Sequence, residues 1–180
     1  DDVGLAIKNG LRVKFVDGEE DNKKITTMAD IINNNTGQNT YTEFRTGIGY
    51  DVHAFVKGQT IILCGIKIPY KYSLMGHSDA DVSMHAITDA LYGAIAEGDI
   101  GRWFPPNEPE WKNKNSEIFL THSKNLLKNR GFLISNIDCT IICEEPKITP
   151  HVKEMKDNIS RILDIEEQRI SIKATTSEKL

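Results

Sequence analysis

The sequence has 180 residues, 39% of them hydrophobic and 27% charged, which is typical of one globular domain with a tail. Its formal net charge of −4 argues against nucleic acids and membrane surfaces as partners, because both attract basic proteins. No apolar run approaches the roughly 18 residues that a membrane span needs, so we expect a soluble protein. The cysteines are odd in number and form no CxxC pair, so we predict buried thiols and no disulfide at Cys64, Cys139 and Cys143.

Residues 1–44 differ in composition from the rest of the chain. They contain clustered charges and an Asn run at residues 33–35, and their short apolar pieces do not recur with a period that builds a core. We therefore predict a mobile N-terminal extension over residues 1–44, followed by a folded domain over residues 45–180.

The domain begins with two predicted strands, over residues 45–53 and 60–68, and Pro69 ends the second strand. A helix is predicted over residues 79–97, and Asp79 is a candidate for its N-cap. Four residues of this helix recur at a spacing of four and form the predicted buried stripe: Val82, Ala86, Ala90 and Ala94.

The second half of the domain continues the alternation of helices and strands. The pattern predicts a helix over residues 116–130, a strand over residues 134–143, a helix that begins at Thr149-Pro150 and a strand over residues 169–175. The predicted fold class is therefore α/β, an α+β two-layer sandwich in which a β-sheet is covered on one side by about three helices.

Asp51, Val52 and His53 form the tripeptide that points most directly to chemistry. Residues i and i+2 of an extended segment point the same way, so the carboxylate and the imidazole can meet at one ion. His85, near the edge of the predicted buried helix face, supplies a second imidazole. Two imidazoles and one carboxylate suit zinc and leave a fourth position open, as catalytic sites require, although other first-row divalent ions fit as well.

A second polar cluster precedes His85 and includes His77, Ser78, Asp79 and Asp81. Asp81 lies one helical turn before His85, so we expect its carboxylate to hydrogen-bond the free ring nitrogen of that histidine. His122 and His151 have no matching partners and are interpreted as surface residues.

Two further segments suit a phosphate and a nucleotide. Residues 173–179 place three hydroxyls, a carboxylate and two amines at a strand end, where Glu178 can hold a magnesium ion that also contacts phosphate oxygens. Glu145, Pro146 and Lys147 form a rigid turn between a strand and a helix start, where a flat ligand can be bound. Each segment alone also fits an ordinary solvated turn.

With these motifs in their observed order, residues 45–180 resemble the 2-C-methyl-D-erythritol 2,4-cyclodiphosphate synthase family of the non-mevalonate isoprenoid pathway. The resemblance is carried by residues 47–53, by residues 77–85, by Asp99-Ile100-Gly101 with Phe104-Pro105, by Pro146-Lys147 and by residues 173–180. It implies a lyase that converts 4-diphosphocytidyl-2-C-methyl-D-erythritol 2-phosphate into the cyclic diphosphate and releases CMP.

The resemblance also implies roles for individual residues. Asp51, His53 and His85 match the zinc ligands, and Glu178 matches the ligand of a second ion, Mg²⁺ or Mn²⁺. His77 and Thr176 match the catalytic residues that stabilise the transition state. The residues that match the family's substrate-binding segments are Asp51, Val52, His53, His77, Ser78, Asp99, Ile100, Gly101, Phe104, Pro105, Pro106, Asn107, Glu108, Cys143, Glu144, Glu145, Pro146, Lys147, Ile148, Thr149, Thr175, Thr176, Ser177 and Glu178.

Members of the family are homotrimers with active sites between subunits, so the resemblance implies a trimeric assembly. The family continues past Leu180 with one more loop and strand, so we expect the domain of residues 45–180 to be C-terminally incomplete. Residues 1–44 precede the family domain and are interpreted as a remnant of organelle targeting. That interpretation implies a plastid-type organelle, an apicoplast or chloroplast, if the source is eukaryotic, and the cytoplasm otherwise.

Two other functions use the same residues. A metal-dependent nucleotide phosphodiesterase would use the ion at Asp51, His53 and His85 to activate water. A non-catalytic zinc module would need a fourth protein ligand, for which the sequence offers only Asp81.

Overall fold

The computed structural model describes residues 2–14, 16–18 and 43–179. The chain divides into two units, residues 1–43 and 44–180, which are described separately. In the first unit the structure describes the helix α1 (Asp2–Lys8), and most of the predicted N-terminal extension lies outside the described residues. None of the described helices is long and apolar enough to cross a membrane.

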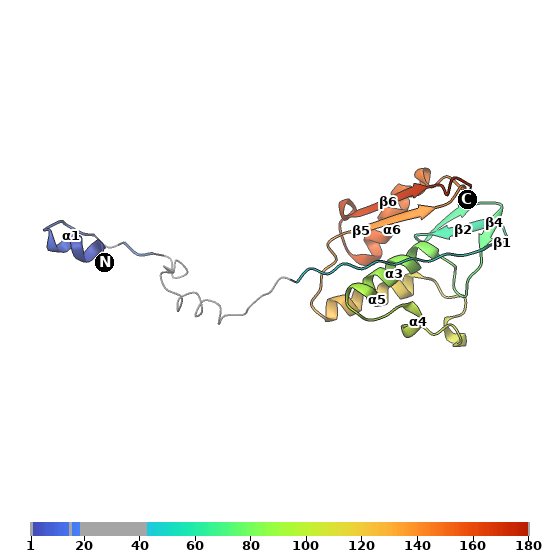
Figure 1. Cartoon of the computed structure of the whole chain (residues 1–180), viewed down its shortest axis with the longest axis horizontal. Helices are drawn as coiled ribbons and strands as arrows, with labels where there is room; N and C mark the ends of the chain where they lie inside the picture. Colours follow the sequence, from blue (N-terminus) through green and yellow to red (C-terminus); the bar gives the residue numbers. More distant parts are fainter. Residues whose placement is uncertain (1, 15, 19–42, 180) are drawn as a thin grey trace. The chain divides into compact units, whose positions relative to one another are not determined.

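The second unit contains three main helices, as the sequence predicts (Figure 1). They are α3 (Val82–Ala94), α5 (Glu117–Asn129) and α6 (Val152–Leu163), and the short helix α4 (Ile100–Trp103) follows α3. The described residues of this unit also form three 3₁₀ turns: η1 (Pro109–Trp111), η2 (Thr149–His151) and η3 (Glu167–Arg169).

The strands of the second unit form three two-stranded ladders among the described residues, so the prediction of one sheet is wrong. The antiparallel pairs are β1 (Phe55–Lys57) with β4 (Tyr72–Leu74) and β2 (Thr60–Leu63) with β3 (Ile66–Pro69), and the parallel pair is β5 (Ile137–Ile142) with β6 (Ile170–Thr175). The single strand predicted over residues 60–68 is a hairpin. Its chain reverses at Cys64 and Gly65, which both have positive φ, and a continuous apolar run hides that reversal.

The core lies between these ladders and the helices. Alternate residues of β5 are buried, and on α6 the residues Met155, Ile159 and Ile162 are buried, as their spacing predicts. On α3 the predicted stripe is wrong, because the fully buried positions include Met84, Ile87, Leu91 and Tyr92, whereas the predicted positions are only half-buried. The three cysteines are free thiols; Cys64 and Cys139 are buried and Cys143 is half-buried.

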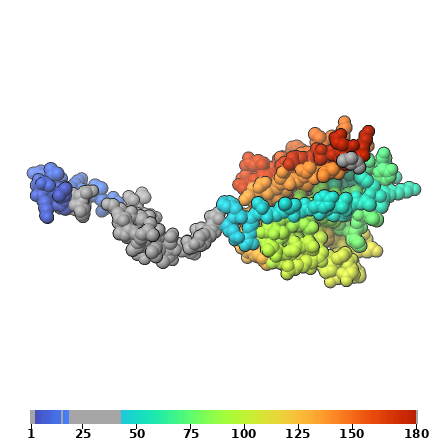
Figure 2. All heavy atoms as spheres, viewed as in Figure 1, coloured from blue at the N-terminus to red at the C-terminus, as the bar shows by residue number. Residues whose placement is uncertain are grey.

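Residues 45–54, which we call the strap, belong to no strand, although residues 45–53 are predicted to form one. The strap packs its backbone directly against α3. A Cβ atom built on Gly47 would lie 1.8 Å from the carbonyl oxygen of Ala90, and one built on Gly49 would lie 1.8 Å from that of Ala86. Glycine therefore permits the close approach. Figure 2 shows the strap as a continuous band of surface atoms across the domain.

Candidate metal centre

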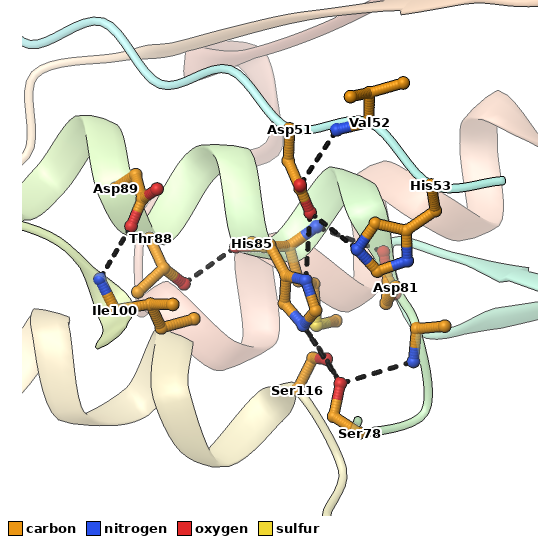
Figure 3. Close-up of polar contacts among 12 residues, drawn as sticks. Asp51, Val52, His53, Ser78, Asp81, His85, Thr88, Asp89, Ile100 and Ser116 are labelled. Carbon is orange, nitrogen blue, oxygen red and sulfur yellow. Dashed lines mark hydrogen bonds and ion pairs between the residues drawn. The ribbon is translucent and has the colours of Figure 1, made fainter. Parts of the chain in front are cut away.

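The strap retains the two-residue alternation of a strand and brings Asp51 and His53 to α3. Gly47 and Gly49 contact the helix, and Asp51 and His53 follow them at the same spacing, while the intervening Val52 is 70% exposed. His85 meets them from α3, one turn after the N-terminus of that helix (Figure 3).

The three side chains converge on one point. Asp51 Oδ2 lies 3.0 Å from His53 Nε2 and 3.0 Å from His85 Nδ1. The three ligand atoms all lie within 4.8 Å of one another, and each residue is half-buried. Tetrahedral zinc, with ligands at about 2.0–2.2 Å, separates its ligand atoms by roughly 3.3 Å. The donor set and its spacing therefore fit a divalent ion with an open fourth position.

The electrostatics of the group favour metal-binding protonation states. Burial raises the pKa of Asp51, but the hydrogen bond from His85, the charge of His53 and the Val52 N–H together outweigh it, so the pKa is lowered. Burial lowers the pKa of His53, and the charge of His85 acts in the same direction against the effect of Asp51. Asp51 is thus held ionised and His53 neutral, the forms that bind metals.

The predicted contact between Asp81 and His85 is wrong. Asp81 is fully buried and caps α3: its carboxylate accepts hydrogen bonds from the backbone N–H groups of Cys64, Gly65 and Met84. The cap is therefore Asp81 and not Asp79. Both oxygens of Asp81 are thus occupied by backbone N–H groups, and the His85 ring hydrogen-bonds to Asp51, Ser78 and Ser116 instead.

A cavity of about 510 Å³ adjoins the metal centre. Nine residues predicted from the sequence line it: Asp51, His53, His77, Ser78, His85, Ile100, Gly101, Phe104 and Pro106. The rest of the lining comes from residues that the sequence did not single out: Met75, Gly76, Asp89, Trp111 and Phe119. The predicted metal ligands, His77, Ser78 and part of the predicted substrate loop thus share one cavity with a largely apolar wall.

A second cavity of about 520 Å³ brings together the strap, β5 with the residues that follow it, and Ser177, which lies just past β6. Asp51, Val52 and His53 line it from the strap, and Cys143, Glu144, Glu145 and Ser177 line it from the predicted nucleotide segments. The Ser177 hydroxyl donates to Glu144 at 2.6 Å and the Lys179 N–H donates to the same carboxylate at 2.9 Å. These bonds tie residues 177–179 to residue 144, and they lower the pKa of Glu144.

Other predicted residues do not line either cavity. The Thr176 hydroxyl donates to Glu178 at 2.9 Å, and both side chains are exposed outside the metal-ligand group. Asp99 caps α4 and Glu108 accepts from Trp111. Seven further predicted residues are not among those that line either cavity: Pro105, Asn107, Pro146, Lys147, Ile148, Thr149 and Thr175. Of these, Ile148 is buried.

Three residues that the sequence analysis missed or misplaced contribute to the site. Asp89 follows His85 by one helical turn, faces the same cavity and accepts from the Ile100 N–H at 2.8 Å, so the spacing of four could have identified it. Ser116 contacts the His85 ring from 31 residues away. His122, predicted at the surface, is half-buried, with its Nδ1 2.7 Å from the Tyr92 hydroxyl and its ring against Phe104.

Comparison with known proteins places this geometry in a family. Residues 44–180 match the YgbB family. The chain belongs to the YgbB family. Over its whole length the chain aligns with a bifunctional enzyme IspD/IspF of Ruegeria pomeroyi at 54% identity and with one of Rhodobacter capsulatus at 53% identity. Each alignment covers 48% of the relative. The chain thus spans about half the length of the curated relatives it matches.

Solved structures of family members share the fold. A 2C-methyl-D-erythritol-2,4-cyclodiphosphate synthase with CDP bound matches with a TM-score of 0.72 and 38% identity, over 76% of this chain and 91% of that one. The bifunctional IspDF from Campylobacter jejuni matches with a TM-score of 0.74 and 35% identity, over 100% of this chain and 48% of that one. The two bifunctional relatives named above are bacterial, so they do not support the predicted plastid.

Proposed function

We propose that this family domain is a 2-C-methyl-D-erythritol 2,4-cyclodiphosphate synthase. One observation carries the proposal: Asp51, His53 and His85 form an open metal-binding group on a cavity that the family's motif residues line. The solved relative with the same fold is a synthase of this name with CDP bound, which supports a cytidine nucleotide as the substrate class.

The reaction is an intramolecular phosphoryl transfer. An oxygen of the substrate's 2-phosphate attacks the β-phosphorus of its diphosphate, the bond from that phosphorus to the CMP oxygen breaks, and CMP leaves with the electron pair. No water and no protein nucleophile take part, so the main task is to fold the substrate into a ring-like pose. Positioning of this kind lowers a barrier by roughly 7–11 kcal/mol. A cavity of about 510 Å³ beside the metal centre has room for such a pose.

The chain's own residues divide this task. Asp51, His53 and His85 would hold a Zn²⁺ or similar ion, which neutralises phosphate oxygens as negative charge moves to the leaving group. His77 and Ser78 line the same cavity and would donate hydrogen bonds to phosphate oxygens. The Phe104 ring supplies an apolar wall for the methylerythritol carbon chain.

Glu178 would hold a second ion, Mg²⁺ or Mn²⁺, and Thr176 would stabilise the transition state, from another subunit of a homotrimer. Two features support an assembly. Thr176 and Glu178 lie outside both cavities of their own chain. The outward residues of the strap form an unusually apolar row, in which Ile48 is 94% exposed and Tyr50 77%.

Residues 45–180 would form the synthase domain and residues 1–44 a segment preceding it. The match with the bacterial bifunctional enzymes includes residues 1–44, which favours a segment shared with those enzymes over a remnant of organelle targeting. Bacterial relatives likewise favour a bacterial cytoplasm over a plastid.

Metal-dependent release of CMP tests the proposal. The protein loaded with Zn²⁺ and Mg²⁺ should release one CMP for each 4-diphosphocytidyl-2-C-methyl-D-erythritol 2-phosphate consumed, and a chelator should stop the reaction. His85→Ala should lose both bound zinc and turnover, because it removes a third of the ligand set. The proposed centre is wrong if this variant keeps both.

A further inference from the structure

The two ring nitrogens of His85 have different surroundings. Nδ1 faces Asp51 Oδ2 at 3.0 Å and belongs to the metal-ligand group. Nε2 faces the opposite way, 2.9 Å from the Ser116 hydroxyl and 3.1 Å from the Ser78 hydroxyl (Figure 3). A neutral His85 ring can therefore bind an ion through Nδ1 only when its proton is on Nε2.

Hydrogen bonding around Ser116 decides where that proton lies. Ser116 is completely buried, and its hydroxyl makes a short contact with Asp79 Oδ1 while its backbone N–H donates to Asp79 Oδ2 at 3.1 Å. A carboxylate only accepts, so the hydroxyl proton of Ser116 points to Asp79. The lone pairs of Ser116 remain for His85, whose Nε2 must then be the donor.

We propose that Ser116 and Asp79 are positioning residues of the metal centre, which hold His85 as the Nε2-protonated tautomer with the Nδ1 lone pair facing the ion. The chain of donors runs from His85 Nε2–H to Ser116 O–H to Asp79. Partners of this kind fix both the tautomer and the orientation of a metal-bound imidazole. This inference rests on the proposed metal role of His85.

Ser78 contributes less to the orientation of the ring. Its hydroxyl oxygen accepts from the Ala80 N–H at 3.2 Å, and its contact with Nε2 is longer than that of Ser116. Ser78 also lines the 510 Å³ cavity, which leaves its hydroxyl proton available to a ligand there. Ser116 is not among the residues that line this cavity, so its effect passes through His85.

Ser116→Ala tests the proposal with little disturbance of the helix. Ser116 is the N-cap residue of α5, but its side chain makes no capping hydrogen bond, so alanine removes only the contacts to His85, Asp79 and Ser78. Zinc affinity is measured by competition with a chromogenic chelator, and urea unfolding of the metal-free protein reports stability separately. Ser116→Ala should weaken zinc binding by about 10–100-fold, and Ser116→Thr, which keeps the hydroxyl, should restore most of it.

Two further variants make the test specific. Ser123→Ala removes another buried hydroxyl of α5, which donates to the Leu120 carbonyl, and should leave zinc affinity unchanged. Asp79→Asn should weaken zinc binding, and combining it with Ser116→Ala should add little, because both act through one chain of hydrogen bonds. In ¹⁵N NMR spectra of the zinc-loaded protein, in which the ion replaces the hydrogen bond from His85 Nδ1 to Asp51, His85 should carry its only proton on Nε2.

The outcomes separate this inference from the proposed function. The role of Ser116 is overturned if Ser116→Ala binds zinc within about threefold of the parent, or if Ser123→Ala loses as much affinity. A proton on Nδ1 of His85 in the zinc-loaded protein also overturns it, even if the enzyme turns over. If Ser116→Ala does not fold, Ser116→Thr and the NMR tautomer decide. Weakened zinc binding in a protein that makes no cyclic product supports the positioning role and contradicts only the proposed reaction.

Discussion

Gly49→Ala should separate the metal centre from the rest of the fold. The strap holds Asp51 and His53 only because its glycines let the backbone lie against α3. The new Cβ atom would stand 1.8 Å from the Ala86 carbonyl oxygen and 2.8 Å from the Ala90 backbone nitrogen, both part of a rigid helix. Since neither atom can yield, the strap must move outward.

The size of that movement follows from contact distances. The strap must move by roughly 1.5 Å to restore van der Waals separation. Metal ligands tolerate only about 0.2 Å of error, and a misplacement of 1 Å can cost about a hundredfold in rate. Overpacking of this kind costs about 1–3 kcal/mol of stability. We therefore expect Gly49→Ala to lose about a hundredfold or more in zinc affinity and turnover while the domain stays folded.

The matched control is Gly93→Ala on α3, where the new methyl group would meet no atom within 4 Å. Alanine is a better helix former than glycine, so this variant should gain up to about 1 kcal/mol in unfolding free energy and keep its zinc affinity. Chelator competition and urea unfolding measure both quantities. If Gly49→Ala binds zinc as the parent does, the close contact between strap and helix does not position the ligands.

Three other predictions concern the fold around the site. Asp81→Asn should cost about 1–3 kcal/mol in urea unfolding at pH 7, because the amide turns a donor toward backbone N–H groups; an unchanged midpoint would contradict the capping role. Burial raises the pKa of Asp81 to about 6 from an ordinary 3.8, so its folded state binds a proton more tightly than the unfolded state. The stability advantage of the parent over Asp81→Asn should therefore increase, by up to about 3 kcal/mol, as the pH falls from 7 to 4, and a decrease would refute the sign. Met155→Ala should lose about 2–5 kcal/mol by calorimetry or denaturant unfolding, since this fully buried side chain fills the core beneath α6, and a smaller loss would mean that the core collapses around it.

The sequence allowed good prediction wherever the signal was local. Helix α5 begins and ends within one residue of its predicted bounds, and α6 follows directly on the 3₁₀ turn at the predicted start Thr149-Pro150. The spacing of Asp51 and His53 correctly predicted that they face one point, although the strap is not a strand. Alternation of side chains requires only an extended backbone, whereas a strand requires a hydrogen-bonded neighbour, which no local pattern reveals.

Contacts between distant segments could not be predicted. Spacing predicted Asp79 as the cap of α3 and Asp81 as the partner of His85, whereas Asp81 is the cap and Asp79 reaches His85 through Ser116. The hairpin at Cys64 and Gly65 explains the difference, because the backbone N–H groups of both residues donate to the Asp81 carboxylate. Ser116 then contacts His85 because α5 packs beside α3, and that packing depends on the whole core.

The product of the reaction tests the central claim most directly. The Zn²⁺- and Mg²⁺-loaded protein is incubated with 4-diphosphocytidyl-2-C-methyl-D-erythritol 2-phosphate in ¹⁸O-labelled water, and the products are identified by phosphorus NMR. A cyclodiphosphate synthase gives CMP and a cyclic diphosphate with two coupled phosphorus signals and no ¹⁸O, because the attacking oxygen comes from the substrate. A linear phosphomonoester that contains ¹⁸O would show that the metal centre activates water, and the assignment as a cyclase would be wrong.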